Sequence, residues 1–298
     1  MATGVPSLPP LRLAQLEGQY TGAIAAKRTK TLVGAALVVG MIGFSAIFGE
    51  VDLVKFFSHI TAFTSYIGRI FVLDSGPHSG QLTFSDPAEW FWGIARWSRL
   101  IGETILIAYL GTLVGGIVAF FAAFLAARNL VRSRLILFVV RRLLEFCRTV
   151  PEIAFAMIFV VAFGFGPLPG VLALAIHTAG SLGKLFFEVV ENADLRAMEG
   201  MTSTGATWVA SVRFAIVPQI LSNFVSYALL RFEINVREGA IMGLVGAGGI
   251  GQDLIEAIRK FYYSDVSAIL ILIVATVSVL DLATEVVRSR LISREAGH

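Results

Sequence analysis

The residues of this sequence best suited to chemistry are four charged side chains in, or at the end of, an apolar segment over 217–236: Arg231, Glu233, Arg237 and Glu238. An ionised side chain inside a hydrocarbon layer costs several kcal/mol unless it is paired, so these residues should face the protein interior or an aqueous path. Glu233 and Arg237 are four residues apart, which places them on one helical face in an order that favours an ion pair. The pattern predicts either a structural pair, within the chain or between two copies, or a path in which Arg231 or Arg237 binds an anion with its guanidinium fork.

Polar residues in the apolar segments extend the set of candidates for such a path. His177, Thr178 and Ser181 lie within the segment 171–190, and Asn235 lies beside the charged residues. A single histidine in such a segment is more often a hydrogen-bonded packing residue than a ligand, and both interpretations stay open.

The sequence offers little to a metal ion or to covalent catalysis. An HExxH motif is absent, and the single cysteine, Cys147, can form neither an intrachain disulfide nor a thiolate cage. GxSxG and intramembrane Ser/Lys or Asp/Asp arrangements are absent too, which argues against an enzyme that acts within the membrane. We expect no catalytic residue and no metal site, although the chain has four histidines: His59, His78, His177 and His298.

The composition indicates the elements that must position these side chains. Of the 298 residues, 56% are hydrophobic and 15% are charged, whereas soluble domains carry roughly 25% charged residues. The mean hydropathy is +0.78. A cytosolic enzyme, a disordered chain and a disulfide-stapled secreted domain are therefore excluded. The net charge of +3 suits basic cytoplasmic loops, and we expect no nucleic-acid partner.

We predict an all-α, polytopic membrane protein with six spans, because a helix needs about 20 mostly apolar residues to cross the bilayer. The third apolar region is interrupted near Thr149-Val150-Pro151, so its span should begin only after the break. We expect no cleaved signal peptide, because a basic stretch followed by an apolar one is missing at the start. The predicted spans cover 31–49, 103–127, 152–165, 171–190, 217–236 and 266–287.

Between the first two spans, Asp86, Pro87 and Glu89 form a helix start. The helix that follows, rich in tryptophan and charge, should lie in the headgroup layer or pack as an amphipathic loop helix.

The distribution of basic residues predicts the orientation. If the N-terminus is cytoplasmic, two-thirds of the 24 lysines and arginines fall in segments on the cytoplasmic side of the membrane. This agrees with the tendency of positively charged loops to stay in the cytoplasm. Both termini are then cytoplasmic. The predicted organisation is a cytoplasmic tail over 1–30 and a first span with an external or interfacial segment over 31–100. A main membrane domain over 101–290, with a cytoplasmic loop over 191–215, and a second tail over 291–298 follow.

The polar loop over 191–215 has an internal order that a simple connector lacks. Glu199 lies in a predicted short helix, Gly205 can turn the chain, and helical spacing resumes over 206–214. Pro218 then begins the fifth span, as prolines do in a first helical turn. Such a rigid projection could dock into a groove on a partner and transmit its motion.

At these residues the sequence resembles a known family. Glu199-Gly200-Met201, Gly205 and Ala215-Ile216-Val217-Pro218 resemble the cytoplasmic signature loop of ABC importer permeases, which reads Glu-Ala-Ala, three residues, Gly, nine residues, Ile-x-Leu-Pro. Gly200 and Met201 replace the two alanines. Segments at 103–129, 177–186, 217–238 and 243–251 are similar to the permease subunit of phosphonate and phosphite importers, so the likeness spans about 101–290.

The resemblance implies a type I ABC importer permease fold in the bacterial inner membrane and a division of labour. Two permease copies would form the pore, two ATPase subunits would hydrolyse ATP with Mg²⁺, and an external binding protein would deliver the substrate. This chain has no GxxxxGK[ST] phosphate loop, and we expect it to hold no cofactor. The coupling element lodged in the ATPase would comprise Glu199, Gly200, Met201, Gly205, Ala206 and Pro218.

Gly246, Gly248 and Gly251 match the dinucleotide motif GxGxxG, but that motif needs a βαβ unit, which cannot be drawn around them. Close helix packing or an unwound stretch is the better interpretation.

Three alternatives stay open for the whole chain: an ABC permease for methionine or another small solute, an ion-driven secondary transporter, and a membrane scaffold.

Overall fold

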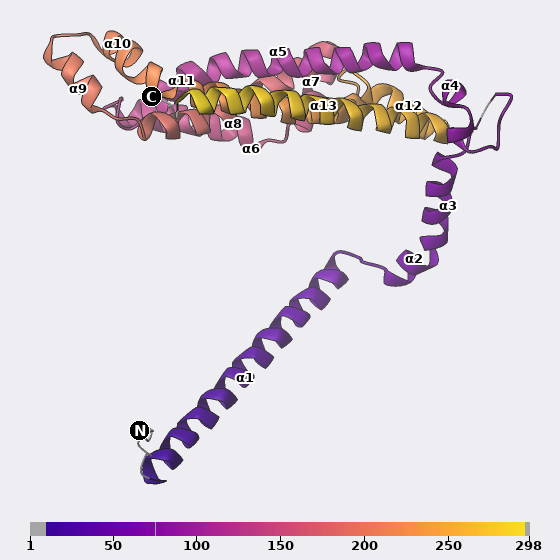
Figure 1. Cartoon of the computed structure of the whole chain (residues 1–298), viewed down its shortest axis with the longest axis horizontal. Coiled ribbons are helices and arrows are strands. Elements are labelled where there is room, and N and C mark those ends of the chain that lie inside the picture. The colour runs from indigo at the N-terminus through magenta and orange to yellow at the C-terminus, as the bar shows by residue number, and fades with distance from the viewer. Residues whose placement is uncertain (1–9, 75, 296–298) are drawn as a thin grey trace, which may run out of the picture. The chain divides into compact units, whose positions relative to one another are not determined.

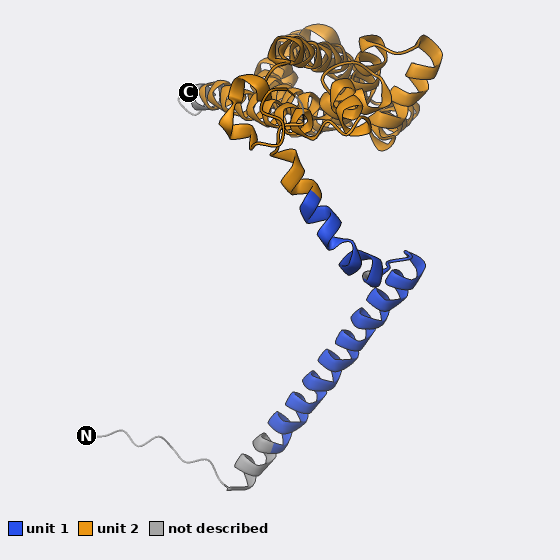
Figure 2. Ribbon diagram, turned by 90° about the vertical axis from the view of Figure 1, so that its right-hand side faces the viewer, with its two compact units in different colours: residues 1–65 blue, residues 66–298 orange. Residues whose placement is uncertain are grey.

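The computed structural model describes residues 10–74 and 76–295. Apart from one antiparallel bridge between Val72 and Leu82, the described residues form helices joined by turns and short loops (Figure 1). The predicted all-α class is confirmed. The chain divides into two compact units, residues 1–65 and 66–298 (Figure 2), and each is described by itself.

The first unit contains α1 (Pro10–Phe48), α2 (Leu53–Ser58) and the start of α3 (Ile60–Ile70). The apolar part of α1 includes the predicted first span, and none of its described side chains is buried. The helix begins at Pro10, a residue suited to a first helical turn, so it runs through most of the segment predicted as a tail. Residues 1–9 of that tail, and 296–298 of the other, lie outside the described residues.

The second unit holds the remaining apolar helices. Among the described residues of the whole chain, five helices are long and apolar enough to cross a membrane, and a bent pair makes up to six. These helices confirm the second, fourth, fifth and last predicted spans. Each helix begins before or at the predicted start, and the second ends one residue before its predicted end. Besides α1 they are α5 (Ile94–Ala126), α8 (Pro167–Glu191), a helical run over 208–245 that includes α11 (Val217–Met242), and α13 (Tyr263–Glu295).

The predicted third span, 152–165, forms a helix close to its predicted bounds, but this helix is too short to cross the bilayer alone. α7 (Glu152–Phe163) has 12 residues and is therefore only about 18 Å long, short of the ~30 Å hydrocarbon core. It meets α6 (Arg134–Thr149) at an angle of 86°. The break lies where predicted, because Pro151 has no N–H to donate and Val150 before it has an extended backbone.

The predicted headgroup-layer helix does not form as a separate element. Asp86 caps α4 (Pro87–Trp90), but that helix has only four residues, and the chain then enters α5. Trp90 and Trp97 are 5% and 2% exposed, and the Trp90 indole donates to Ser267 Oγ at 3.0 Å. The packed alternative therefore holds for these two side chains, while Trp92 stays exposed.

Small residues let the helices of the second unit approach closely. A Cβ at Gly115 of α5 would lie 2.6 Å from the carbonyl oxygen of Ala175 in α8, and one at Gly180 of α8 would lie 2.5 Å from the backbone nitrogen of Arg148 in α6. Membrane helices associate through close backbone packing at such positions, because the apolar lipid around them provides no hydrophobic driving force for association. The result is a tight α5–α8–α6 core.

Candidate functional site

The segment between α8 and α11 projects from one end of the helical bundle (Figure 1). It consists of α9 (Arg196–Ser203), α10 (Trp208–Ser211) and the π-helical turn η2 (Val212–Ile216). Gly205 turns the chain with a φ of +82°, a left-handed conformation that favours glycine. The Thr207 hydroxyl accepts the N–H of Ala210 and begins the second helix. The predicted helix, glycine turn and second helix are therefore present, and we call residues 192–216 the projecting segment.

The predicted contact residues of this segment are largely open to a partner. Glu199, Gly200, Gly205 and Pro218 are exposed, and Met201 and Ala206 are half-buried. Pro218 lies in the first turn of α11, as predicted.

Gln219 fixes the base of the projecting segment, and the sequence analysis did not single it out. Its Oε1 accepts the N–H of Asp194 at 3.0 Å, and its Nε2 donates to the Asp194 carbonyl at 3.1 Å and to the Ala215 carbonyl at 2.6 Å. These bonds join the first residues of the segment to its last across 25 positions. In the sequence, only the position of Gln219 next to Pro218 could have indicated this role.

Two further sets of contacts fix the segment, one within it and one to the loop after α5. The hydrogen bonds of the Arg196 guanidinium to both oxygens of Asp194 hold the pKa of that carboxyl below its usual range. Asp194 therefore stays ionised near neutral pH and accepts the first N–H of α9, that of Arg196, at 2.9 Å. The Trp208 indole donates to the carbonyl of Leu130, in the loop after α5, at 3.2 Å.

A polar cluster beside this base joins the ends of α5 and α8 to the middle of α6. Arg141 donates to the Ala126 carbonyl through Nε at 2.8 Å and Nη2 at 2.7 Å, and it also pairs with Glu191. The second donor to Glu191 is the backbone N–H of Arg128. Arg141 thus satisfies a free carbonyl at the end of α5 and ties that end to α8.

The candidate path residues fall into three groups, the first of which surrounds Arg231. Its Nη2 lies 2.8 Å from both His177 Nδ1 and Glu238 Oε2. His177 Nδ1 also lies 3.3 Å from Glu152 Oε2, while Nε2 faces the Arg148 carbonyl at 3.1 Å. The Arg231 donor at Nδ1 and the Arg148 carbonyl acceptor at Nε2 fit the tautomer with its hydrogen on Nε2. Arg231 thus pairs with Glu238 directly, and His177 connects it to Glu152 at the bend between α6 and α7.

The second group confirms the predicted ion pair. Arg237 Nη2 donates to Glu233 Oε1 at 2.7 Å and lies 3.7 Å from Asp281 Oδ1 of α13. Arg237 is half-exposed, unlike Arg231, whose side chain is 12% exposed.

The third group is buried among the helices. Asn235 of α11 is 0% exposed, and its Nδ2 donates to the hydroxyls of Thr112 in α5 at 2.7 Å and Thr178 in α8 at 2.9 Å. This placement favours a packing role for Asn235 and Thr178, since the bonds join three helices. Ser181, one turn further along α8, is half-buried.

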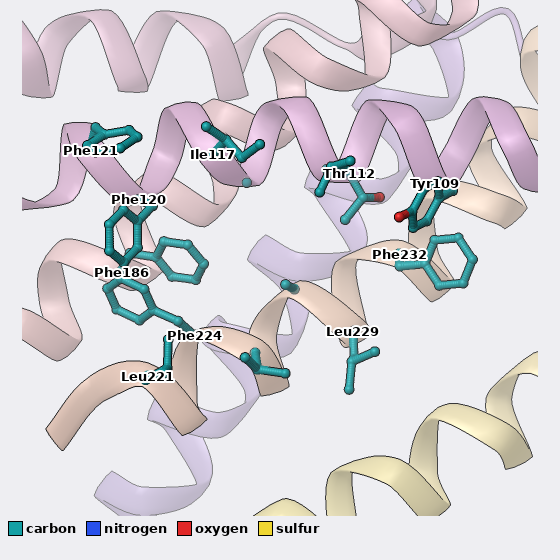
Figure 3. Close-up of a pocket in the computed structure, with 14 residues that line it drawn as sticks. Tyr109, Thr112, Ile117, Phe120, Phe121, Phe186, Leu221, Phe224, Leu229 and Phe232 are labelled. Atoms are coloured by element: carbon teal, nitrogen blue, oxygen red, sulfur yellow. The ribbon is translucent and has the colours of Figure 1, made fainter. Parts of the chain in front are cut away.

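A cavity of about 750 Å³ lies between α5 and α11 (Figure 3). Its wall is almost entirely apolar, with Tyr109 and Phe232 toward one end and the stacked rings of Phe186 and Phe224 toward the other. An anion would lose its hydration there without compensation. The cavity therefore suits hydrocarbon rather than a charged solute.

The glycine-rich stretch is unwound and closely packed, as predicted. Gly246, Gly248 and Gly249 have φ values of +86°, +89° and +78°. Two backbone N–H groups freed by this geometry donate to α5: that of Gly249 to Glu103 Oε1 at 3.2 Å, and that of Ile250 to Thr104 Oγ1 at 3.0 Å. The described residues around the stretch are helices and turns, which is not the context of a dinucleotide motif.

Three comparisons place this architecture among known proteins. The chain is 40% identical over 198 residues to the phosphite transport system permease protein PtxC of Stutzerimonas stutzeri, which covers 66% of this chain and 72% of that protein. It is 44% identical over 121 residues to the putative cryptic phosphonate transport system permease protein PhnE2 of Escherichia coli (strain K12), which covers 41% of this chain and 99% of that protein. A solved chain of the inward-facing MetNI methionine ABC transporter superposes with a TM-score of 0.58 at 19% identity, over 65% of this chain and 95% of that one.

The solved structure shows the fold alone, which is that of a type I ABC importer permease. The model of the family described as "Binding-protein-dependent transport system inner membrane component" matches residues 115–295. These residues hold the projecting segment, the Arg231 group and the glycine-rich stretch. The chain therefore belongs to the family of inner membrane components of binding-protein-dependent transport systems.

Proposed function

We propose that this chain is the membrane-spanning permease subunit of an ATP-driven importer for phosphite, phosphonate or a related oxyanion delivered by an external binding protein. The observation that carries the proposal is the projecting segment, an exposed helical unit with Glu199, Gly205 and Pro218 at the family spacing and a base fixed by Gln219. The names of the relatives support the solute class, since they are phosphite and phosphonate transport permeases.

The working assembly contains two copies of this chain, two ATPase subunits and the binding protein. ATP and Mg²⁺ bind in the ATPases, and this chain holds no cofactor and catalyses no reaction. Both termini and the projecting segment lie on the cytoplasmic side of the inner membrane, in line with the distribution of basic residues.

Closure of the ATPases on ATP pushes on the projecting segment, which Glu199, Gly200, Met201, Gly205 and Ala206 present to them. The segment transmits the push through its base. Gln219 connects it to α11, and Trp208 connects it to the loop after α5, where Arg141 joins α5, α6 and α8. Access to the path then changes from the outside to the inside.

Arg231 and Arg237 assist the anion along the path. Each already binds a carboxylate, Arg231 that of Glu238 and Arg237 that of Glu233, so a solute must compete for the guanidinium. This competition keeps binding weak, which suits a solute that must leave again. His177 belongs to the Arg231 group and Ser181 follows one turn further along α8, while Thr178 and Asn235 join α8 to α11.

The alternatives have less support. A methionine permease shares the fold, but that likeness is at 19% identity, which says nothing about the solute. An ion-driven carrier would have no use for the projecting segment, and transport without an ATPase would be its signature.

The test uses Glu199→Arg and Gly205→Val, with Ser203→Ala as the matched control. Ser203 lies in the same exposed helix, and its hydroxyl only bonds the Glu199 carbonyl one turn back. We expect both test variants to lose ATPase association and ATP-dependent uptake of phosphite into proteoliposomes by at least about tenfold, and the control to retain both. A valine at Gly205 would be strained because φ there is positive. Intact association and uptake in both variants would disprove the coupling role.

A further inference from the structure

A cluster of potential metal ligands that the transport function does not use lies in the loop between α3 and α5. His78 Nδ1 is 2.9 Å from Glu89 Oε2 and 3.3 Å from Asp86 Oδ2. The three ligand atoms all lie within 4.8 Å of one another. The His78 side chain is 47% exposed, so the group opens to solvent on one side.

Asp86 has one oxygen engaged and one directed at the cluster. Its Oδ1 accepts the N–H groups of Ala88 at 3.0 Å and Glu89 at 3.1 Å, which caps α4. The cap fixes the carboxylate plane, and Oδ2 is left facing His78. The ligand atom is thus held in place by a contact that does not depend on a metal ion.

Glu89 packs against the backbone at Gly76. Its Oε1 is buried and has no hydrogen-bond partner among the described residues. A Cβ at Gly76, where φ is +92°, would lie 1.9 Å from that oxygen. Only glycine leaves room for the carboxylate, which keeps its other oxygen directed at His78.

The backbone around the cluster sets the spacing of these side chains. Thr83 N–H donates to the Phe71 carbonyl, Leu73 N–H to the Gln81 carbonyl, and Gly80 N–H to the Leu73 carbonyl, each at 2.9 Å. Thr83 itself is fully buried. The loop is therefore a fixed frame in which His78 faces the first turn of α4.

We propose that His78, Asp86 and Glu89 bind a zinc ion, with solvent in the fourth position. Ligands about 2.0–2.2 Å from a tetrahedral zinc ion lie roughly 3.3–3.6 Å apart. The distances from His78 Nδ1 to Asp86 Oδ2 (3.3 Å) and to Glu89 Oε2 (2.9 Å) need to change by less than an ångström to reach that range. The two carboxylates carry two negative charges, and among the described residues His78 is the group that pairs with them. An imidazole nitrogen in the set favours zinc over magnesium or calcium.

The other His and Glu cluster, Glu152, His177 and Glu238, does not invite the same proposal. The Arg231 guanidinium bonds to His177 and Glu238 and so occupies the place that a metal ion would need. The zinc proposal is also independent of the transported solute.

The test titrates zinc chloride into the purified, untagged full chain in lipid nanodiscs after treatment with a chelator. We expect one tight site per chain by calorimetry. His78→Ala and Asp86→Asn should each weaken it at least about tenfold. Asparagine keeps the capping oxygen, so the second variant removes the charge without removing the helix start. Gly76→Ala should weaken binding too, because it displaces Glu89.

His59→Ala is the matched control, since His59 is also exposed and bonds only residues of its own turn. It should bind zinc like the unaltered chain. Excess zinc should also raise the thermal unfolding temperature of the unaltered chain by more than that of Asp86→Asn. Equal zinc affinity in the unaltered chain and in His78→Ala would overturn the proposal.

Discussion

At the scale of single residues, the projecting segment depends on side chains that bond backbone groups. Gln219 satisfies the N–H and carbonyl of Asp194 and the carbonyl of Ala215. A glutamine can do this because its amide carries both a donor and an acceptor. Glutamate has the same shape as glutamine but lacks the amide donors. Comparing Gln219→Glu with Gln219→Ala therefore separates loss of the donors from loss of the whole side chain.

We therefore expect Gln219→Glu and Gln219→Ala both to loosen the base of the segment by about 0.5–1.5 kcal/mol, the net contribution of a typical hydrogen bond, because the bonds to Asp194 are exposed. The hydrogen-exchange rates of residues 194–216 should rise, and the ratio of phosphite transported to ATP hydrolysed should fall several-fold. Thr204→Ala, an exposed change in the same segment, is the control. Unchanged exchange rates in Gln219→Ala would contradict the positioning role.

At the scale of elements, α5 and α8 are held together by backbone contact at glycines. Gly115 faces the Ala175 carbonyl at a distance that leaves no room for a methyl group, whereas the nearest atom to a Cβ at Gly116, its neighbour, is Leu182 Cδ1 at 3.8 Å. Gly111 and Gly115 match the GxxxG pattern of closely packed membrane helices. That pattern was readable in the sequence, but its partner helix was not.

The neighbouring glycines offer a matched experiment. Gly115→Ala should destabilise the chain by about 1–3 kcal/mol, because overpacking forces the two backbones apart. Gly116→Ala should be neutral or slightly stabilising, since alanine favours the helix. Thermal unfolding in the same detergent measures both, and equal stabilities would show that α5 and α8 are further apart than the structure has them.

At the scale of the whole molecule, the few intramembrane charges are balanced across elements. Arg231 of α11 faces Glu238 of the same helix, His177 of α8 and, through that histidine, Glu152 of α7. The group holds the bent α6–α7 pair against two spans. The structural role and the proposed transport role would therefore fall on one arginine, and a single substitution cannot separate them.

A double substitution can separate these roles. Arg231→Gln alone should cost about 3–5 kcal/mol because it leaves Glu238 unpaired, and Arg231→Gln with Glu238→Gln should regain most of that stability. If Arg231 assists the anion, phosphite uptake should stay at least about tenfold reduced in the stable double variant. Normal uptake by the double variant would limit Arg231 to a structural role.

Sequence reasoning predicted the features of this protein that depend on local chemistry. The charge deficit indicated membrane helices, Pro151 marked the bend, and the spacing of Glu233 and Arg237 predicted their ion pair. The order of helix, glycine turn and helix around Gly205 followed from backbone preferences. The charge deficit is a property of the composition, and each of the other features depends on residues within a few positions of one another. The pattern along the chain is therefore enough to predict them.

The tertiary structure decided what depends on distant partners. It placed Arg231 beside His177, buried Asn235 against two threonines from other helices, and paired Gln219 with Asp194. It also placed His78 next to Asp86 and Glu89, in a loop whose sequence matches no metal-binding motif named above. These contacts need a particular packing of helices or a particular loop path, and the spacing of residues along one chain does not specify either.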